Sequence, residues 1–152
     1  MPIKRTVETE EQMLALGKSV AELLEKTGFI ALYGDLGAGK TVFVRGVASA
    51  FGVSHVQSPT FTIVCEYPTE PRLYHFDAYR LSDADELYAI GFEDYRKDDA
   101  MLLMEWANLV SSALPKDRLD VTITGSGTDA RTVELTPHGA RYEEMLHEDS
   151  CI

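Results

Sequence analysis

The chain has 152 residues, 45% of them hydrophobic, and a formal net charge of −11. This length and composition predict one packed domain over residues 1–152 and argue against a disordered chain. The surplus of acid argues against strong binding of DNA or RNA by the chain alone, because nucleic-acid-binding domains neutralise phosphates with clustered Lys and Arg.

The first part of the chain predicts a helix, a buried strand and a second helix. Thr9 and Gln12 have the spacing of a capping box, and apolar residues at helical spacing follow as far as Gly28, where we expect the helix to stop. The apolar run 29–33 is typical of a strand that is buried on both faces. Beyond a glycine-rich stretch, apolar residues recur at helical spacing over 43–51, and Gly52 closes this second helix.

The glycine-rich stretch fits the phosphate-binding pattern G-x-x-x-x-G-K-[ST] at every fixed position. Its glycines let backbone N–H groups turn inward, and the helix that follows adds a partial positive charge, so the loop suits a polyphosphate. Lys40 is expected to reach the β- and γ-phosphates, and Thr41 to offer its hydroxyl to Mg²⁺. The alternative is a turn that only joins strand to helix. The expected binding residues are Gly34, Asp35, Leu36, Gly37, Ala38, Gly39, Lys40, Thr41 and the adjoining Val42.

The rest of the chain predicts further strands and helices. Residues 61–67 and 73–77 are typical of an antiparallel strand pair, and an acidic helix is expected from Ser82 to about Gly91. A second apolar strand, 100–104, ends at Glu105. A hairpin of strands 119–124 and 131–135 precedes a last helix, 138–147. We therefore expect an α/β fold, a P-loop NTPase-like domain with a mixed parallel and antiparallel sheet flanked by helices.

Two acidic residues stand at the ends of predicted strands. Glu105 follows the apolar run 100–104, and Asp77 follows residues 73–76. Because ligands bind at the carboxyl ends of strands in open α/β sheets, either residue could hold the metal or orient the attacking water. The alternative for each is a helix cap or an ion pair, and Arg80 is the obvious partner for Asp77.

Other candidates rest on less specific patterns. Thr60, in the turn Ser58-Pro59-Thr60, could sense the γ-phosphate or the metal, or could only begin a strand. Trp106, beside Glu105, could pack near the nucleotide or fill the core, and the core is the default. The four histidines show no metal-ligand spacing.

The acidic charge lies mostly in the second half. Before Asp77 there are eight acidic and seven basic residues, and from Asp77 onward seventeen and seven. The densest stretch, 83–99, is either a solvated helix and turn or a docking surface for a basic partner. No apolar run approaches the ~20 residues of a membrane span, no signal-peptide pattern occurs, and two cysteines make no disulfide framework. These features favour a cytoplasmic protein with no membrane contact.

The ordered set GDLGAGKT, SPTFTIV, YHFDAYRL and MLLMEW resembles the TsaE family, formerly called YjeE, from about Thr9 to about Leu146. The resemblance implies a weak Mg²⁺-dependent ATPase required to make N6-threonylcarbamoyladenosine in tRNA. It implies the partners TsaB and TsaD, of which TsaD carries the transferase site, so that tRNA is reached only through the complex. ATP hydrolysis would let that complex cycle between turnovers.

The resemblance also assigns roles to residues. Lys40 matches the phosphate-binding position, Thr41 and Glu105 match Mg²⁺-site positions, and Asp77 matches an acid of the nucleotide site that we group with the metal ligands. Thr60 matches a threonine near the nucleotide. Lys40, Asp77 and Glu105 are thus the expected catalytic residues.

Three positions extend or depart from that pattern. Arg131 could lie near the adenine or ribose. Val42 replaces a second threonine that is common in the family, with little loss expected, since the metal needs only the first hydroxyl. Met13 replaces a common threonine, which puts a polar contact to the base from this position in doubt.

Two other functions compete with an ATPase subunit. A nucleotide-gated docking module would use ATP binding without needing hydrolysis, and the acidic stretch 83–99 would be its partner surface. A small-molecule kinase or a GTPase is disfavoured, because the chain has no Asn-Lys pair for guanine recognition and no arginine-rich lid.

Overall fold

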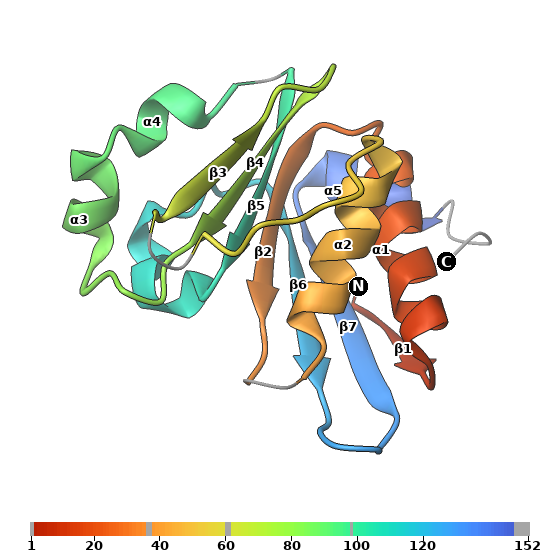
Figure 1. The fold of residues 1–152 in the computed structure, drawn as a ribbon. Helices are drawn as coiled ribbons and strands as arrows, with labels where there is room; N and C mark the ends of the chain where they lie inside the picture. The colour runs from red at the N-terminus through yellow and green to blue at the C-terminus, as the bar shows by residue number, and fades with distance from the viewer. Residues whose placement is uncertain (1, 36–37, 60–61, 98, 148–152) are drawn as a thin grey trace.

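The fold centres on a seven-stranded sheet with strand order β1-β7-β6-β2-β5-β4-β3 (Figure 1). This computed structural model describes residues 2–35, 38–59, 62–97 and 99–147. Strands β6, β2, β5 and β4 run parallel, and antiparallel partners extend the sheet at both edges. The predicted mixed sheet is confirmed. The strands are β1 (Ile3–Val7), β2 (Gly28–Tyr33), β3 (Val64–Tyr67), β4 (Arg72–Asp77), β5 (Ala100–Glu105), β6 (Arg118–Thr124) and β7 (Arg131–His138).

Helices cover both faces of the sheet, to different extents. Figure 1 shows α1, α2 and α5 on one face, whereas α3 and α4 lie toward the β3–β4 end of the sheet, where buried residues of α3, α4 and η1 pack against the other face. Among the described residues, no helix has the length and apolarity needed to cross a bilayer. The helices are α1 (Glu10–Leu23), α2 (Lys40–Ala50), α3 (Ala84–Ala89), α4 (Phe92–Tyr95), the 3₁₀ helix η1 (Ala107–Ala113) and α5 (Ala140–His147).

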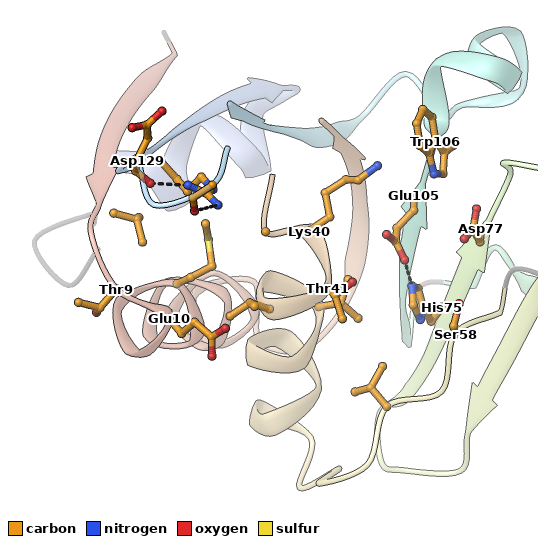
Figure 2. Close-up of a pocket in the computed structure, with 18 of the residues that line it drawn as sticks. Thr9, Glu10, Lys40, Thr41, Ser58, His75, Asp77, Glu105, Trp106 and Asp129 are labelled. Carbon is orange, nitrogen blue, oxygen red and sulfur yellow. Dashed lines mark hydrogen bonds and ion pairs between the residues drawn. The ribbon is translucent and has the colours of Figure 1, made fainter. Parts of the chain in front are cut away.

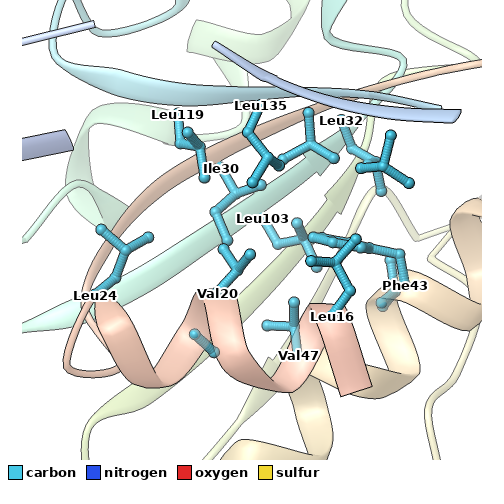
Figure 3. Packing of buried hydrophobic residues seen from close by; sticks show 14 of the residues in the cluster. Leu16, Val20, Leu24, Ile30, Leu32, Phe43, Val47, Leu103, Leu119 and Leu135 are labelled. Carbon is cyan, nitrogen blue, oxygen red and sulfur yellow. The ribbon is translucent and has the colours of Figure 1, made fainter. Parts of the chain in front are cut away.

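Alternating side chains of the buried strands divide the core into two clusters. Ile30 and Leu32 of β2 face the α1/α2 side, where Leu16 and Val20 of α1 pack with Phe43 and Val47 of α2 (Figure 3). Phe29 and Ala31 face the opposite side, toward α3, α4 and η1. The central strand is therefore apolar on both faces, as the unbroken run 29–33 predicts.

Helices α1 and α2 touch through their backbones. A Cβ atom on Gly46 would lie 2.3 Å from the carbonyl oxygen of Leu14, and one on Gly17 would lie 2.4 Å from that of Phe43. Only glycine permits this approach, which holds the middle of α1 against the middle of α2.

The ends of α1 differ in part from prediction. Thr9 caps the helix, since its hydroxyl accepts from the N–H of Gln12 at 3.1 Å. The Gln12 side chain reaches back to the N–H of Glu8 at 2.7 Å, one residue before the position that a capping box requires. The helix ends before Gly28, because Glu25 takes the left-handed conformation (φ 56°) and the N–H of Lys26 binds the carbonyl of Ala21 at 2.8 Å. This Schellman turn uses glutamate where glycine is usual, and Gly28 begins β2 instead.

Other boundaries shift as well. Asp83, rather than Ser82, caps the acidic helix, which ends at Ala89. Gly91 is then the N-cap of the short α4. His138 is the last residue of β7 rather than the first of a helix. The strand predicted from residue 61 begins at Val64, and Phe61 lies outside the described residues. Strand β1 was not predicted, because its short edge sequence IKRTV has two charged residues among five.

Candidate functional site

Three candidate segments meet at the carboxyl edge of the parallel strands. The glycine-rich loop follows β2, while Asp77 ends β4 and Glu105 ends β5. Asp77 and Glu105 are register partners in the β4–β5 ladder, and Leu32 of β2 pairs with Glu105 on the other side. The topology therefore brings together groups that lie as many as 71 positions apart in the sequence, at the edge where α/β sheets bind ligands.

The glycine-rich loop leads directly into the N-terminus of α2. Gly39 is left-handed (φ 104°) and makes no side-chain cap, so the first N–H groups of α2 have no cap from this residue. Gly34 (φ 150°) passes so close to β6 that a Cβ atom would lie 2.7 Å from the carbonyl oxygen of Ile123. Leu36 and Gly37 lie outside the described residues. The described part of the loop thus provides an open helix N-terminus, which favours an anion.

A cleft of about 920 Å³ opens beside this loop (Figure 2). The start of α1 and the β6–β7 turn form one wall, and the ends of β4 and β5 form the other. The predicted site residues that line it are Gly39, Lys40, Thr41, Val42, Asp77, Glu105 and Arg131. Of the remaining predicted residues, Asp35 is exposed, Ala38 is buried and Thr60 lies outside the described residues.

Lys40 is the most unusual group in the cleft. The residue is 6% exposed, and its Nζ has no hydrogen-bond partner among the described residues. Burial lowers the pKa of Lys40, although the nearby carboxylates of Glu105 and Asp77 oppose this shift. A buried ammonium without a hydrogen-bond acceptor is costly, and a phosphate oxygen would supply that acceptor. The site therefore fits an anionic ligand.

Trp106 forms the wall beside Lys40. The Lys40 Nζ lies 3.8 Å from the centre of the Trp106 ring, a cation–π contact. Trp106 adopts the left-handed conformation (φ 58°, ψ 36°), which is rare for a bulky residue and places it between β5 and η1. Its ring also lies 5.0 Å from that of Tyr79. The default assignment of Trp106 to the core is thus incomplete, because the residue is half-buried and lines the cleft.

The two carboxylates are held differently. Asp77 is 5% exposed, and its Oδ1 accepts from the N–H of Tyr79 at 2.9 Å. Glu105 Oε2 lies 2.7 Å from Nε2 of His75, a residue that sequence reasoning missed. The available signal was the strand spacing, since His75 and Asp77 lie two apart in β4 and share a face. Within the described residues, no group of three or more His, Cys, Asp or Glu could hold a metal by itself. Magnesium usually takes one or two carboxylates together with substrate phosphates, and the cleft offers that incomplete set.

Arg131 links two parts of the cleft wall. Its Nε donates to the carbonyl of Ala38 at 3.0 Å, and its Nη2 donates to that of Gly127 at 3.1 Å. The Nη1 donates to the carbonyl of Asp129. Arg131 therefore lines the cleft while its guanidinium fastens the glycine-rich loop to the β6–β7 turn.

Comparison with known proteins agrees with this geometry. Residues 7–133 match the family described as Threonylcarbamoyl adenosine biosynthesis protein TsaE. The tRNA threonylcarbamoyladenosine biosynthesis protein TsaE of Bacillus subtilis (strain 168) is 40% identical over 146 residues, covering 95% of this chain and 90% of that protein. The protein of the same name from Haemophilus influenzae is 42% identical over 133 residues, covering 83% and 84%. The crystal structure of Bacillus subtilis YdiB superposes with a TM-score of 0.81 at 32% identity, covering 97% of this chain and 93% of that one. The resemblance seen in the motifs is thus confirmed, and the chain belongs to the TsaE family.

Proposed function

We propose that residues 1–152 act as one cytoplasmic P-loop domain, an Mg²⁺-dependent ATPase in the synthesis of N6-threonylcarbamoyladenosine in tRNA. The main support for the proposal is that the Lys40 ammonium is buried at the open N-terminus of α2 with no hydrogen-bond acceptor among the described residues. Glu105 and Asp77 stand in the same cleft. The names of the relatives supply the pathway.

Different residues of the cleft would bind the phosphates and the metal during ATP hydrolysis. The backbone N–H groups of the loop 34–41 would hold the phosphates, and Lys40 would bind the β- and γ-phosphate oxygens. Thr41, Glu105 and Asp77 are the residues that would hold Mg²⁺. When bound, Mg²⁺ neutralises the charge that develops on the phosphate oxygens as water attacks in line and the bond to the leaving ADP breaks. Lys40 shares that electrostatic role, which is stronger in a buried site than in water.

Other predicted contacts are parts of the same proposal. Thr60 would approach the nucleotide from the turn that follows α2. Arg131 would act near the base or ribose by shaping the loop. Because its guanidinium is already bound to backbone carbonyls, we propose that a partner supplies any arginine finger. Hydrolysis should then rise when TsaB and TsaD are added.

We propose TsaB and TsaD as partners, with tRNA reached only through them. The acidic segment 83–99, of which Asp98 lies outside the described residues, is largely exposed over α3 and α4, and none of its described residues lines the cleft. A basic protein surface would complement it and be steered toward it, whereas the phosphates of tRNA would be repelled. Charge reversal at Asp85 and Glu86, both exposed on α3, tests this surface. Assembly of the complex should weaken and become less dependent on salt.

Catalysis is tested by ATP hydrolysis with Lys40→Ala, using exposed Lys18→Ala on α1 as the matched control. Lys40→Ala should abolish hydrolysis and tRNA modification over many turnovers, and Lys18→Ala should affect neither. Modification at the normal rate by Lys40→Ala would refute the proposal.

A nucleotide-gated docking module is the second candidate, favoured by the exposed acidic segment. Asp77→Asn or Glu105→Gln with ATP separates the two functions. If the variant still assembles with the complex but tRNA modification stops after one turnover, the complex needs a cycle of ATP hydrolysis. Full modification by a variant that binds but does not hydrolyse ATP indicates a gate.

A further inference from the structure

We infer that His75 is a positioning residue that orients Glu105 for the metal site, an inference that rests on the proposed ATPase function. His75 lies in β4 two residues before Asp77, and its register partner in β5 is Leu103, two residues before Glu105. Because alternate residues of a strand share a face, the three side chains approach the same end of the sheet.

The contact between His75 and Glu105 is short and largely shielded from solvent. Nε2 lies 2.7 Å from Oε2, and the two side chains are 3% and 13% exposed (Figure 2). A hydrogen bond to a carboxylate in such surroundings is stronger than one between neutral groups, and little water can replace it. His75 therefore restricts the rotamer of Glu105 more firmly than a solvated partner could.

The second ring nitrogen identifies which group donates the hydrogen bond. Nδ1 of His75 is buried and has no partner among the described residues. A proton on Nδ1 would leave a buried N–H donor unpaired and would set two acceptors, Nε2 and the carboxylate, against each other. A proton on Nε2 avoids that repulsion, because Nε2–H then pairs with the carboxylate. Nε2–H then donates to Oε2, and no other hydrogen bond to the Glu105 side chain occurs in the described part of the chain, so Oε1 is left for a ligand in the cleft.

Packing alone does not explain a histidine at position 75. Its register partners in the neighbouring strands are Cys65 and Leu103, beside which an apolar side chain would pack without burying an unpaired nitrogen. Carboxylates that bind a metal are usually held by hydrogen bonds from other groups, and removing such partners typically lowers metal affinity or activity by about 10- to 100-fold.

The chain contains a comparable pair that serves as a control. His138 Nε2 lies 2.8 Å from Asp120 Oδ2, but Arg118 also holds that carboxylate through Nε at 2.8 Å, and none of the three lines the cleft. His138→Asn should therefore leave the hydrolysis and the magnesium dependence of the full-length protein unchanged.

The test compares His75→Gln with His75→Asn. The glutamine amide nitrogen can occupy the place of Nε2 and donate to Glu105, whereas the shorter asparagine matches only Nδ1. Fluorescence of Trp106, the only tryptophan, reports ATP binding in EDTA and its change on adding Mg²⁺. We expect His75→Asn to raise the Mg²⁺ concentration for half-saturation, or to lower kcat, by about 10- to 100-fold, and His75→Gln to stay within about threefold. ATP affinity in EDTA should be unchanged in both.

A second comparison shows whether His75 acts through Glu105. In the Glu105→Gln background the difference between His75→Asn and His75→Gln should vanish, because the group being oriented is gone. If His75→Asn lowers Mg²⁺ affinity or kcat equally with Glu105 present and with Glu105→Gln, His75 does not act through Glu105. If His75→Asn and His75→Gln lower them equally, the hydrogen bond is not what matters. Either result would overturn the inference and leave His75 a structural role only. His75→Leu, which suits the apolar surroundings and lacks the donor, replaces His75→Asn if the latter does not fold.

Nitrogen NMR of the imidazole in the wild-type protein gives a readout without catalysis. A proton on Nε2 is expected, and the absence of a proton on Nε2 would overturn the inference. If Glu105→Gln lowers hydrolysis while His75→Asn and His75→Leu do not, this inference alone fails. If Glu105→Gln hydrolyses ATP at the wild-type rate, the proposed function and the inference about His75 are both refuted.

Discussion

Replacing Lys40 by methionine is expected to stabilise the ATP-free protein, although the same change removes its proposed phosphate contact. Burial lowers the pKa of Lys40 more than Glu105 and Asp77 raise it, so the folded protein disfavours the charged form. A buried donor without an acceptor costs about 1–3 kcal/mol, and the cation–π contact with Trp106 offsets about 0.5–2 kcal/mol of that cost. Methionine keeps the apolar stem without the charge. The net gain should be about 1 kcal/mol, or about 2–4 °C in Tm for a chain of this length.

Added ATP should reverse that order. Ligand at one hundred times its Kd stabilises the folded state by about 2.7 kcal/mol, so wild type should unfold at a higher temperature than Lys40→Met once Mg²⁺ and ATP are present. Thermal melts followed by circular dichroism, with and without nucleotide, measure both values. Lys18→Met on the exposed surface of α1 is the control, with no change expected in either condition. If Lys40→Met is less stable than wild type without ATP, the buried charge of Lys40 does not destabilise the ATP-free protein, and the reasoning is refuted.

Three further predictions concern stability. Gly46→Ala should lower the free energy of unfolding by about 1–3 kcal/mol in urea titrations, because the new methyl would overlap the carbonyl oxygen of Leu14 at 2.3 Å; unchanged or increased stability, as helix propensity alone favours, would contradict it. Glu25→Gly should raise the denaturation midpoint by an amount equivalent to about 1 kcal/mol, since glycine takes the left-handed conformation (φ 56°) without steric cost, and a lower midpoint would count against it. The stability gap between Lys40→Met and wild type should shrink as the pH rises toward 10.5, the ordinary pKa of lysine, because the unfolded chain then holds a proton on Lys40 that the folded protein has lost; a gap independent of pH would show that this charge is not strained.

The elements that carry the site were largely predictable because their signals are local. The run 29–33, the motif 34–41 and the strands that end at Asp77 and Glu105 are read from consecutive residues. Their meeting at one sheet edge follows from parallel pairing, which a strand–helix alternation predicts. Thr9 was identified as a cap for the same reason, since capping depends on residues three apart.

Features set by tertiary contact were not predictable. The left-handed turn at Glu25 is supported from afar, since Arg141 of α5 donates to the carbonyl of Leu24 at 2.6 Å. Likewise, the place of Trp106 depends on a left-handed backbone and on a lysine sixty-six positions earlier. The pairing of His75 with Glu105 joins two strands. The spacing within β4 places His75 on the same face as Asp77, but only the β4–β5 register brings it to Glu105.

The proposed role of this chain is to hydrolyse ATP so that the modification complex can act repeatedly. Its most direct test is the number of tRNA molecules modified per complex when TsaB and TsaD are combined with this protein, ATP and Mg²⁺. Wild type is predicted to modify many tRNA molecules per complex, whereas Glu105→Gln, with ATP bound, should modify no more tRNA molecules than there are complexes. Repeated turnover by Glu105→Gln without ATP hydrolysis would contradict the account.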